Sequence, residues 1–436
     1  MKRPRLLLAL AAACAVVALA ASGVSVWALT ADASQAGSVE ASSSAAAPAD
    51  RLAKRAGSPV RTGAFSFGHT IVNEVPSPGG PIDAGMRLPF ELGVPATQFR
   101  VHLRNWQFNS EEVFDSPVTI TGMAVGEQSE SPVGTTGGAA DGTVTSLSGE
   151  FAGTPIGIAG AANLSAEGFV TNWIDPSRFE LHAGTSYLLA VGFTAPAGAR
   201  LASSQALSWL DTDGASGLIA TPGVLGAAGP HSYFDVWIEY GFEGDAPLLV
   251  SVGHSLNAPG SIRTDLFPTR GEETAWPQQW ALSNDAVAVS FASPGAETTV
   301  FAPGNSKWQQ FGELQPDIVT VWTASNDIAH GRPLADIQRD WTAVLAGVRA
   351  RWPEAQVLAM TDPPRHLTGE AEATRLAWNA WLALVPAGVD RVLDADFALR
   401  DPAQPSELRP DVDADGTHFS ARGHSLIADL VPAPRR

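Results

Sequence analysis

The segment DVDADGTHFSARGH, residues 411–424, supports two chemical interpretations. Asp411, Asp413 and Asp415 alternate and are followed by a glycine, which is how many calcium-binding loops begin. Asp415 also stands three residues before His418, a spacing at which a carboxylate can orient an imidazole that acts as a general base. The first interpretation predicts a metal-binding protein, and the second predicts a catalytic one.

The calcium interpretation fails at the end of its own template. An EF-hand loop that begins at Asp411 needs a bidentate carboxylate at its twelfth position, and that position is Arg422. A guanidinium cannot bind a metal cation. The pattern therefore favours the Asp415–His418 pair, and we expect neither a metal site nor another cofactor.

Three further residues of catalytic type each follow an apolar run. Ser255 follows a glycine at an expected strand-to-helix turn, where its hydroxyl can project and the amides of the helix start can face negative charge. Gly295 can bring an unshielded backbone N–H close to a substrate. Asn326 offers a neutral amide donor, which favours a transition-state anion more selectively than a permanent cation would. Ser255 alone is weak evidence, because most serines of Gly-x-Ser segments cap a helix.

Together with the Asp/His pair, these residues make a complete set for nucleophilic catalysis. The Asp415 carboxylate can accept a hydrogen bond from His418 Nδ1, which leaves Nε2 free to take the proton of Ser255. We therefore expect Ser255 to be the nucleophile, His418 the general base and Asp415 the group that orients it.

The elements that must position these residues are buried parallel strands. Apolar runs with little alternation are expected of strands covered on both faces. Such runs lie at residues 246–253, 286–293, 317–324, 355–362 and 390–397. Helical patterns separate them, the clearest at 333–352, where apolar residues recur at intervals of three and four. Alternating strands and helices predict a doubly wound α/β sheet, in which ligands bind beyond the carboxyl ends of the strands.

In four sequence blocks the chain resembles the SGNH (GDSL-type) hydrolases. The residues that give the family its name occur here in the family's order, each after the appropriate strand: Ser255, Gly295, Asn326 and His418. The strongest block is DADGTHFSARGHSLIAD, which matches the family's Asp-x-x-His followed by a C-terminal helix. The resemblance covers residues 246–432 and implies a flavodoxin-like sheet. It also implies ester hydrolysis through an acyl-serine, with Ser255, Gly295 and Asn326 as the oxyanion donors.

The first and third blocks depart from the family's pattern. Gly-His-Ser at 253–255 stands where the family usually has Gly-Asp-Ser, and Ala-Ser-Asn-Asp at 324–327 stands for Gly-x-Asn-Asp. Neither change removes a triad or oxyanion group, but both alter the hydrogen bonding around them. The alternative function is therefore a cell-surface binding protein that has kept the fold and lost catalysis.

The first half of the folded chain has a different periodicity. Apolar and polar residues alternate at 99–103 and again at 234–240, as expected of strands with one buried face. TSYLLAVGFTA is a further strand candidate, and Gly and Pro turns separate many short segments. We predict an all-β sandwich domain at 61–243 before the hydrolase domain at 244–436. This arrangement resembles a secreted subset of SGNH enzymes.

The N-terminal residues 1–29 indicate export. A short basic segment precedes an apolar run from Leu6 to Leu29, which fits either a cleaved signal peptide or a signal anchor. The sequence leaves both open, and in both cases the folded part lies outside the cytoplasm, secreted or at the cell surface. Cys14 is the one cysteine and lies in this run, so the exported part has no disulfide. Residues 30–60, rich in Ala and Ser, are expected to be a flexible linker.

Composition narrows the range of partners. The formal net charge is −18, with 45 acidic against 27 basic side chains among 436 residues, which opposes binding to nucleic acid or to an anionic membrane surface. Membrane contact is expected only through an N-terminal anchor. The resemblance implies an acylated small molecule or polysaccharide as substrate, because SGNH-like sites serve acetylated sugars, lipids and simple esters. The predicted protein is an exported serine esterase, with acyl groups on carbohydrate among its candidate substrates.

Overall fold

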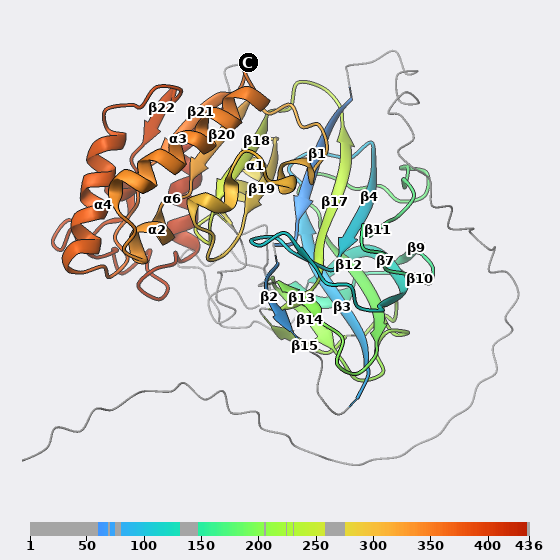
Figure 1. The fold of residues 1–436 in the computed structure, drawn as a ribbon. Coiled ribbons are helices and arrows are strands. Elements are labelled where there is room, and N and C mark those ends of the chain that lie inside the picture. The colour runs from blue at the N-terminus through green and yellow to red at the C-terminus, as the bar shows by residue number, and fades with distance from the viewer. Residues whose placement is uncertain are drawn as a thin grey trace, which may run out of the picture. The chain divides into compact units, whose positions relative to one another are not determined.

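The apolar runs of the second half of the chain form one parallel sheet in the computed structural model (Figure 1). The structure describes residues 60–68, 70–74, 80–130, 147–204, 206–223, 225–229, 231–257 and 275–433. The predicted signal segment at 1–29, with Cys14, and the predicted linker apart from residue 60 lie outside the described residues. No helix of the described part is both long and apolar enough to span a membrane.

The parallel sheet brings the ends of its central strands together. Its strands are β18 (Leu248–Gly253), β19 (Val287–Ala292), β20 (Ile318–Trp322), β21 (Gln356–Met360) and β22 (Arg391–Leu393). They lie in the order β19-β18-β20-β21-β22, which is 2-1-3-4-5 in chain order. Gly253 at the end of β18 pairs with Ala292 on one side and with Trp322 on the other. The strand order reverses here, which is where sheets of this kind place their ligands.

Both faces of this sheet are buried, which explains why its strands lack alternation. Val250 lies in a hydrophobic cluster with Trp341 of the helix α3 (Leu334–Arg351). Its neighbour Leu249 points to the opposite face and lies in a second cluster with Trp280 of α1 (Trp276–Ser283) and Ile427 of α6 (Ala421–Leu430). Helices thus cover the sheet on two sides.

The helices follow the predicted alternation with the strands. They are α1 (Trp276–Ser283), α2 (Ser325–Ala329), α3 (Leu334–Arg351), α4 (Gly369–Leu382), α5 (Ala395–Leu399) and α6 (Ala421–Leu430), with the 3₁₀ helices η4 (Thr298–Phe301) and η5 (Ser306–Gln309). The helix predicted at 333–352 is confirmed as α3. The last apolar run ends as a strand at Leu393, because the Asp394 side chain accepts from the Phe397 N–H and caps α5.

The described residues before Gly244 are mostly strand, as predicted. A four-stranded sheet has the order β1 (Arg61–Ser66), β17 (Asp235–Phe242), β4 (Gln98–Arg104) and β11 (Phe169–Val170). An eight-stranded sheet has the path β10 (Ala162–Asn163), β7 (Thr119–Glu130), β12 (Ser186–Ala195), β3 (Ile82–Glu91), β14 (Ser208–Asp211) and β15 (Ala227–Gly229), with β8 (Leu147–Phe151) and β9 (Ile156–Ala159) paired to β7. The remaining strands are β16 (Ser232–Tyr233), β13 (Leu201–Ser204) and β2 (Thr70–Glu74) in one sheet, and β5 (Trp106–Gln107) and β6 (Glu112–Val113) in a hairpin.

The alternation predicted for β4 is confirmed, but the one predicted for β17 is wrong on its outer side. In β4, Phe99 and Leu103 are buried and their polar neighbours are half-buried. In β17, Asp235 and Trp237 were expected to face solvent, yet they are 0% and 4% exposed. The physical reason is a covering segment of the α/β region, in which Gln310 Nε2 donates to Asp235 Oδ2 at 2.9 Å.

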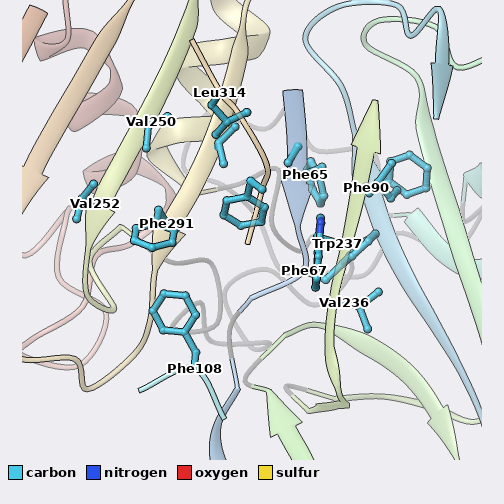
Figure 2. Packing of buried hydrophobic residues seen from close by; sticks show 14 of the residues in the cluster. Phe65, Phe67, Phe90, Phe108, Val236, Trp237, Val250, Val252, Phe291 and Leu314 are labelled. Atoms are coloured by element: carbon cyan, nitrogen blue, oxygen red, sulfur yellow. The ribbon is translucent and has the colours of Figure 1, made fainter. Parts of the chain in front are cut away.

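The β-rich and α/β regions share one hydrophobic core. Phe108, in the β5–β6 hairpin, lies beside Phe291 of β19 (Figure 2). The Phe108 ring centroid is 5.4 Å from that of Phe291 and 6.2 Å from that of Phe301 in η4. Trp237 of β17 lies 6.0 Å from Phe311. Both regions belong to one compact unit. A boundary at residue 244 between two separate domains stays a prediction.

Candidate active site

Ser255 lies just beyond the end of β18, in a tight turn. The Asn257 N–H closes this turn by donating to the His254 carbonyl oxygen at 2.8 Å. A Cβ on Gly253 would lie 2.3 Å from a main-chain oxygen of β20, so glycine is required where the strands pass this closely. Residues 258–274, which follow this turn, lie outside the described residues, so the helix expected after Ser255 stays a prediction.

Ser255, His418 and Asp415 form a continuous chain of hydrogen bonds. Ser255 Oγ and His418 Nε2 are 3.0 Å apart, and His418 Nδ1 and Asp415 Oδ2 are 2.9 Å apart. An ionised carboxylate only accepts, so the proton of the neutral imidazole lies on Nδ1, and Nε2 accepts from the serine hydroxyl. This is the geometry that a nucleophile, a general base and an orienting acid require.

The environment of Asp415 keeps the carboxylate negative. Burial acts to raise the pKa of this carboxyl, but hydrogen bonds from the His418 ring and from the N–H groups of His418 and Thr417 outweigh it. The pKa of Asp415 therefore lies below its ordinary value. The two N–H donors are 2.8 and 3.0 Å from Oδ1. The turn at 415–418 thus orients the Asp415 carboxylate toward the His418 ring and stabilises its negative charge.

The alternating aspartates have separate partners. Asp411 pairs with Arg409 at 3.1 Å. Asp413 Oδ1 accepts from the Gly416 N–H at 2.6 Å, while Asp415 binds the histidine. Within the described ranges, no group of three or more His, Cys, Asp or Glu side chains is placed to hold a metal ion. The local geometry is that of an Asp/His pair.

Gly416 allows a neighbouring loop to press against this turn. Its φ is +84°, and a Cβ there would lie 2.2 Å from Nδ1 of His366. The His366 ring is held from its other side by Glu407, with Nε2 and Oε2 2.7 Å apart. A side chain at position 416 would therefore displace the His366 ring from Glu407.

Asn326 lies beyond the end of β20, against the loop that carries Gly295. Its Nδ2 donates to the Ala296 carbonyl oxygen at 2.9 Å, and the residue is 6% exposed. Gly295 has a φ of +72°, in the left-handed region that favours glycine, within a turn closed by a bond from the Ala296 N–H to Ser293. The structure brings these two predicted residues together, and Asn326 Nδ2 keeps a second N–H for a ligand.

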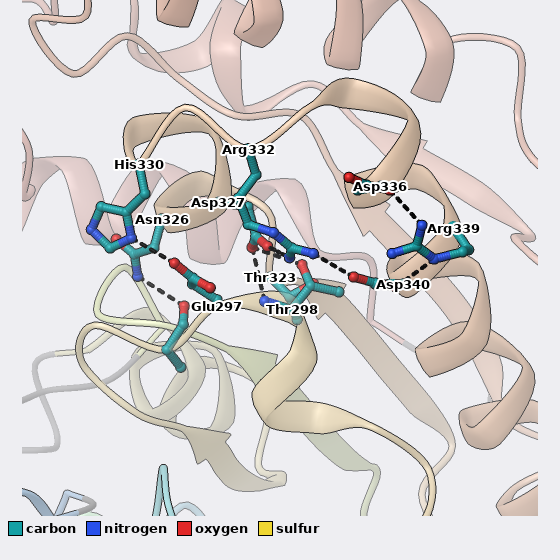
Figure 3. Close-up of polar contacts among 11 residues, drawn as sticks. Glu297, Thr298, Thr323, Asn326, Asp327, His330, Arg332, Asp336, Arg339 and Asp340 are labelled. Atoms are coloured by element: carbon teal, nitrogen blue, oxygen red, sulfur yellow. Dashed lines mark hydrogen bonds and ion pairs between the residues drawn. The ribbon is translucent and has the colours of Figure 1, made fainter.

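Asp327 ties the two loops to each other (Figure 3). Its Oδ2 accepts from the Thr298 N–H at 2.8 Å and from the Thr298 hydroxyl at 2.9 Å, and its Oδ1 pairs with Arg332. Arg332 also pairs with Asp340 of α3 at 2.6 Å. Burial raises the pKa of Asp327, and these hydrogen bonds only partly oppose it. The residue after Asn326 is thus part of the support of the site.

His254, which stands where the family usually has an aspartate, is fully buried. Its Nδ1 accepts from the Leu256 N–H at 3.3 Å, which places the ring proton on Nε2. Nε2 has no hydrogen-bond partner among the described residues. Burial, followed by the charges of Arg365 and His418, lowers the pKa of His254 well below its ordinary value, so the ring is neutral. His254 stabilises the turn of Ser255 by accepting this hydrogen bond, and an aspartate at the same position could accept it too.

Two contributors to the site were missed by the sequence analysis. Arg365 follows β21 at the same sheet edge and donates to the Asn326 side chain. Asn109, in the β5–β6 hairpin, donates through Nδ2 to the Pro294 carbonyl oxygen at 3.3 Å, next to Gly295. The arginine had a usable signal, since it follows two prolines at the carboxyl end of a parallel strand. The hairpin had none, because its contact spans 185 residues of sequence.

Comparison with known proteins agrees with this geometry. Residues 252–426 match the model of the GDSL-like Lipase/Acylhydrolase family. The resemblance predicted from the four blocks is thereby confirmed for this part of the chain. The match supports a GDSL-type hydrolase fold and ester hydrolysis as the class of activity. The comparison with curated protein sequences gives no match.

Several solved structures are similar to the chain. A member of the lipolytic protein G-D-S-L family from Veillonella parvula DSM 2008 is 14% identical, with a TM-score of 0.34, over 42% of this chain and 96% of that one. The psychrotrophic esterase EstA from Pseudoalteromonas sp. is 16% identical, with a TM-score of 0.32, over 42% and 93%. A family two carbohydrate esterase from Clostridium thermocellum, in complex with cellohexaose, is 12% identical, with a TM-score of 0.34, over 84% and 96%. With TM-scores this low, these likenesses define neither the fold nor the substrate of this chain.

Proposed function

We propose that the protein is an exported serine esterase that hydrolyses carboxylic esters through an acyl-serine intermediate. The observation that carries the proposal is the unbroken chain from Ser255 Oγ through His418 to Asp415, with donor–acceptor distances of 3.0 and 2.9 Å. The match of residues 252–426 to an acylhydrolase family supports the reaction class. The strand order 2-1-3-4-5 supports a flavodoxin-like arrangement of the sheet.

In the first half of the reaction, Ser255 Oγ attacks the acyl carbon of the ester. His418 Nε2 takes the hydroxyl proton as the new C–O bond forms. The negative charge moves to the carbonyl oxygen, where the backbone N–H groups of Ser255 and Gly295 and the free N–H of Asn326 can receive it. His418 then gives its proton to the departing alcohol, and the acyl group stays on the serine.

In the second half, water replaces the alcohol. His418 takes a proton from the water, the hydroxide attacks the acyl carbon, and the proton returns to Ser255 Oγ as the acid leaves. Asp415 is negative throughout and stabilises the imidazolium that forms in each half. Asn326 is neutral, so its interaction with the oxygen strengthens as charge develops.

We propose that the substrate is an ester outside the cytoplasm or on the cell surface. Acyl groups on carbohydrate are the first candidates. Two sequence features support a substrate that lies outside the cytoplasm and is not strongly anionic. The apolar N-terminal run predicts export, and the net charge of −18 disfavours anionic polymers and membranes as substrates. The carbon chain of the acyl group is the variable that a substrate series should scan.

The test combines covalent labelling with turnover. We expect a fluorophosphonate probe to label the wild-type protein on Ser255 and a chromogenic acetyl ester to be cleaved. Ser255→Ala should abolish both, whereas the matched control Ser177→Ala, an exposed serine of the β-rich region, should change neither. A folded wild-type protein that neither labels nor cleaves short and long acyl esters would favour the binding-protein alternative.

A further inference from the structure

The loop after β21 delivers a charged side chain to the oxyanion side of the site. Arg365 Nη1 lies 3.2 Å from Asn326 Oδ1 and 2.8 Å from Ser325 Oγ, and it donates to both. The two residues before it, Pro363 and Pro364, are buried and restrict the backbone of this loop. Arg365, which follows β21, thus places its guanidinium against the first residues of α2, which follows the neighbouring strand β20.

The Asn326 amide has two ends that differ chemically but have nearly the same shape. Its oxygen can only accept, and its nitrogen can only donate. Arg365 also can only donate, so it must face Oδ1. The Ala296 carbonyl can only accept, so it must face Nδ2, at 2.9 Å. Both neighbours therefore select the same orientation of the amide.

That orientation is the one that an oxyanion requires. With Oδ1 toward the guanidinium and one N–H on Ala296, the second N–H of Asn326 remains for the substrate. In the reversed amide, Oδ1 would face the Ala296 carbonyl oxygen and the developing negative charge. A cation on Oδ1 also polarises the amide, which strengthens its N–H groups as donors.

Neighbouring carboxyl groups favour the charge of Arg365 at this partly buried position. Burial lowers the pKa of Arg365, and the carboxylates of Asp362 and Asp415 oppose that shift. Burial raises the pKa of Asp362 to about 7, so near neutral pH Asp415 is the neighbouring carboxyl that stays fully ionised. The guanidinium contacts the Oδ1 end of the Asn326 amide, and the neutral Nδ2 end is the one that we expect to face the substrate.

We propose that Arg365 is a positioning residue that fixes and polarises the Asn326 amide as an oxyanion donor. The proposal rests on the esterase function proposed above. It differs from a general structural role because it requires the effect of Arg365 to pass through one side chain, Asn326. A double-mutant cycle measures that requirement directly.

The experiment compares wild type, Arg365→Ala, Asn326→Ala and the double variant on a chromogenic acetyl ester. We expect Arg365→Ala to lower kcat about tenfold to fiftyfold with KM changed less than about twofold, because the oxyanion exists only in the transition state. Asn326→Ala should lower kcat about a hundredfold to a thousandfold. In the Asn326→Ala background, Arg365→Ala should cost less than about twofold more.

Two further variants control the cycle. Arg365→Lys keeps a cationic donor and should recover part of the lost kcat. Arg349→Ala removes a matched arginine of α3, which donates to Gly388, Ala355 and Asp390 away from the site, and should leave kcat unchanged. Circular dichroism and melting temperature show whether each variant is folded, and the cycle is run with Arg365→Met, which also removes the donor, if Arg365→Ala is not.

The outcomes separate the two proposals. Full additivity of Arg365→Ala and Asn326→Ala, or no recovery in Arg365→Lys, would overturn the positioning role while the wild-type activity upholds the esterase. A folded wild type that neither turns over ester nor labels with fluorophosphonate would overturn the esterase function and the positioning role with it.

Discussion

The β-rich region holds a fully buried arginine, the α/β region holds a half-buried one at its sheet edge, and the partners of the two differ in kind. Arg87 of β3 donates to main-chain carbonyl oxygens of Gly149, Ile219, Thr221 and Gly223 at 2.5 to 3.2 Å. Its guanidinium also lies 4.5 Å from the centroid of the Phe151 ring. Arg365 instead donates to two side chains at a sheet edge.

This difference separates a structural cation from one that serves a site. By donating to main-chain carbonyl oxygens, Arg87 fixes the segment at 219–223 onto the sheet. All of its N–H groups are used in these bonds, so none is free to contact a substrate. Side-chain partners can themselves face a substrate, so Arg365 passes its influence on. For these two arginines, the identity of the hydrogen-bond partners distinguishes a role in stability from a role at the site.

The strongest test of the comparison lies at the strand ends of the α/β region. Ser255→Ala and His418→Ala should each lower kcat by about 10⁴-fold or more, because nucleophile and base act as one unit. The melting temperature should stay within a few degrees of wild type, since neither side chain carries hydrophobic packing. Kinetics with a chromogenic ester and a thermal melt measure the two effects. A variant that loses activity only by unfolding would contradict the division between function and stability.

The converse test is Arg87→Met in the β-rich region. Methionine fills part of the volume but leaves several buried carbonyl groups without a donor, so the free energy of unfolding should fall by about 3 kcal/mol. The kcat of the protein that remains folded should be unchanged. Urea unfolding gives the first quantity, and kinetics normalised to fluorophosphonate-labelled sites gives the second. A specific loss of kcat would show that Arg87 also serves the active site.

A smaller effect should cross from one region to the other. Asn109 of the hairpin donates to the Pro294 carbonyl oxygen beside Gly295. Asn109→Ala removes one hydrogen bond, worth about 1 kcal/mol, and should lower kcat about twofold to fivefold through a less fixed oxyanion loop. Ser110→Ala, at the next position, is the matched control and should leave kcat unchanged. Equal rates for both variants would confine catalysis to the α/β region.

The smallest effect concerns the lysine that joins the two regions. Lys307 is fully buried, and its Nζ donates to the Phe108 carbonyl oxygen at 2.7 Å. Burial, partly opposed by Glu111, lowers the pKa of Lys307 to about 8. In the unfolded chain the pKa returns to its ordinary value of 10.5, so between these values the unfolded state holds more protons.

The stability contributed at Lys307 should therefore rise with pH from about 8 to 10.5. The measurement is the difference in unfolding free energy between wild type and Lys307→Met from pH 7 to 10, which cancels groups that both proteins share. The unfolding free energy of the wild type should increase relative to that of the variant as the pH rises through this range. A difference that is flat or falls with pH would mean that Lys307 stays charged in the folded protein.

The sequence by itself determined the features that depend on neighbours along the chain. Continuous apolar runs follow from burial on two faces, and they located β18, β19, β20 and β21 within a few residues. The Asp415–His418 pair is local, since three residues and one turn bring the carboxylate to the ring. The pattern that disfavours a calcium loop is local too, because a cation stands where the template needs a carboxylate.

Only the tertiary structure decided which distant groups meet. The Arg365 contact to Asn326 spans 39 residues and the Lys307 contact to Phe108 spans 199, and no periodicity encodes such partners. The outer face of β17 reads as solvent-exposed in sequence, yet Trp237 is buried because another region packs on it. Alternation reports the burial that a strand's own sheet requires, whereas a covering element adds burial through contacts that only folding creates.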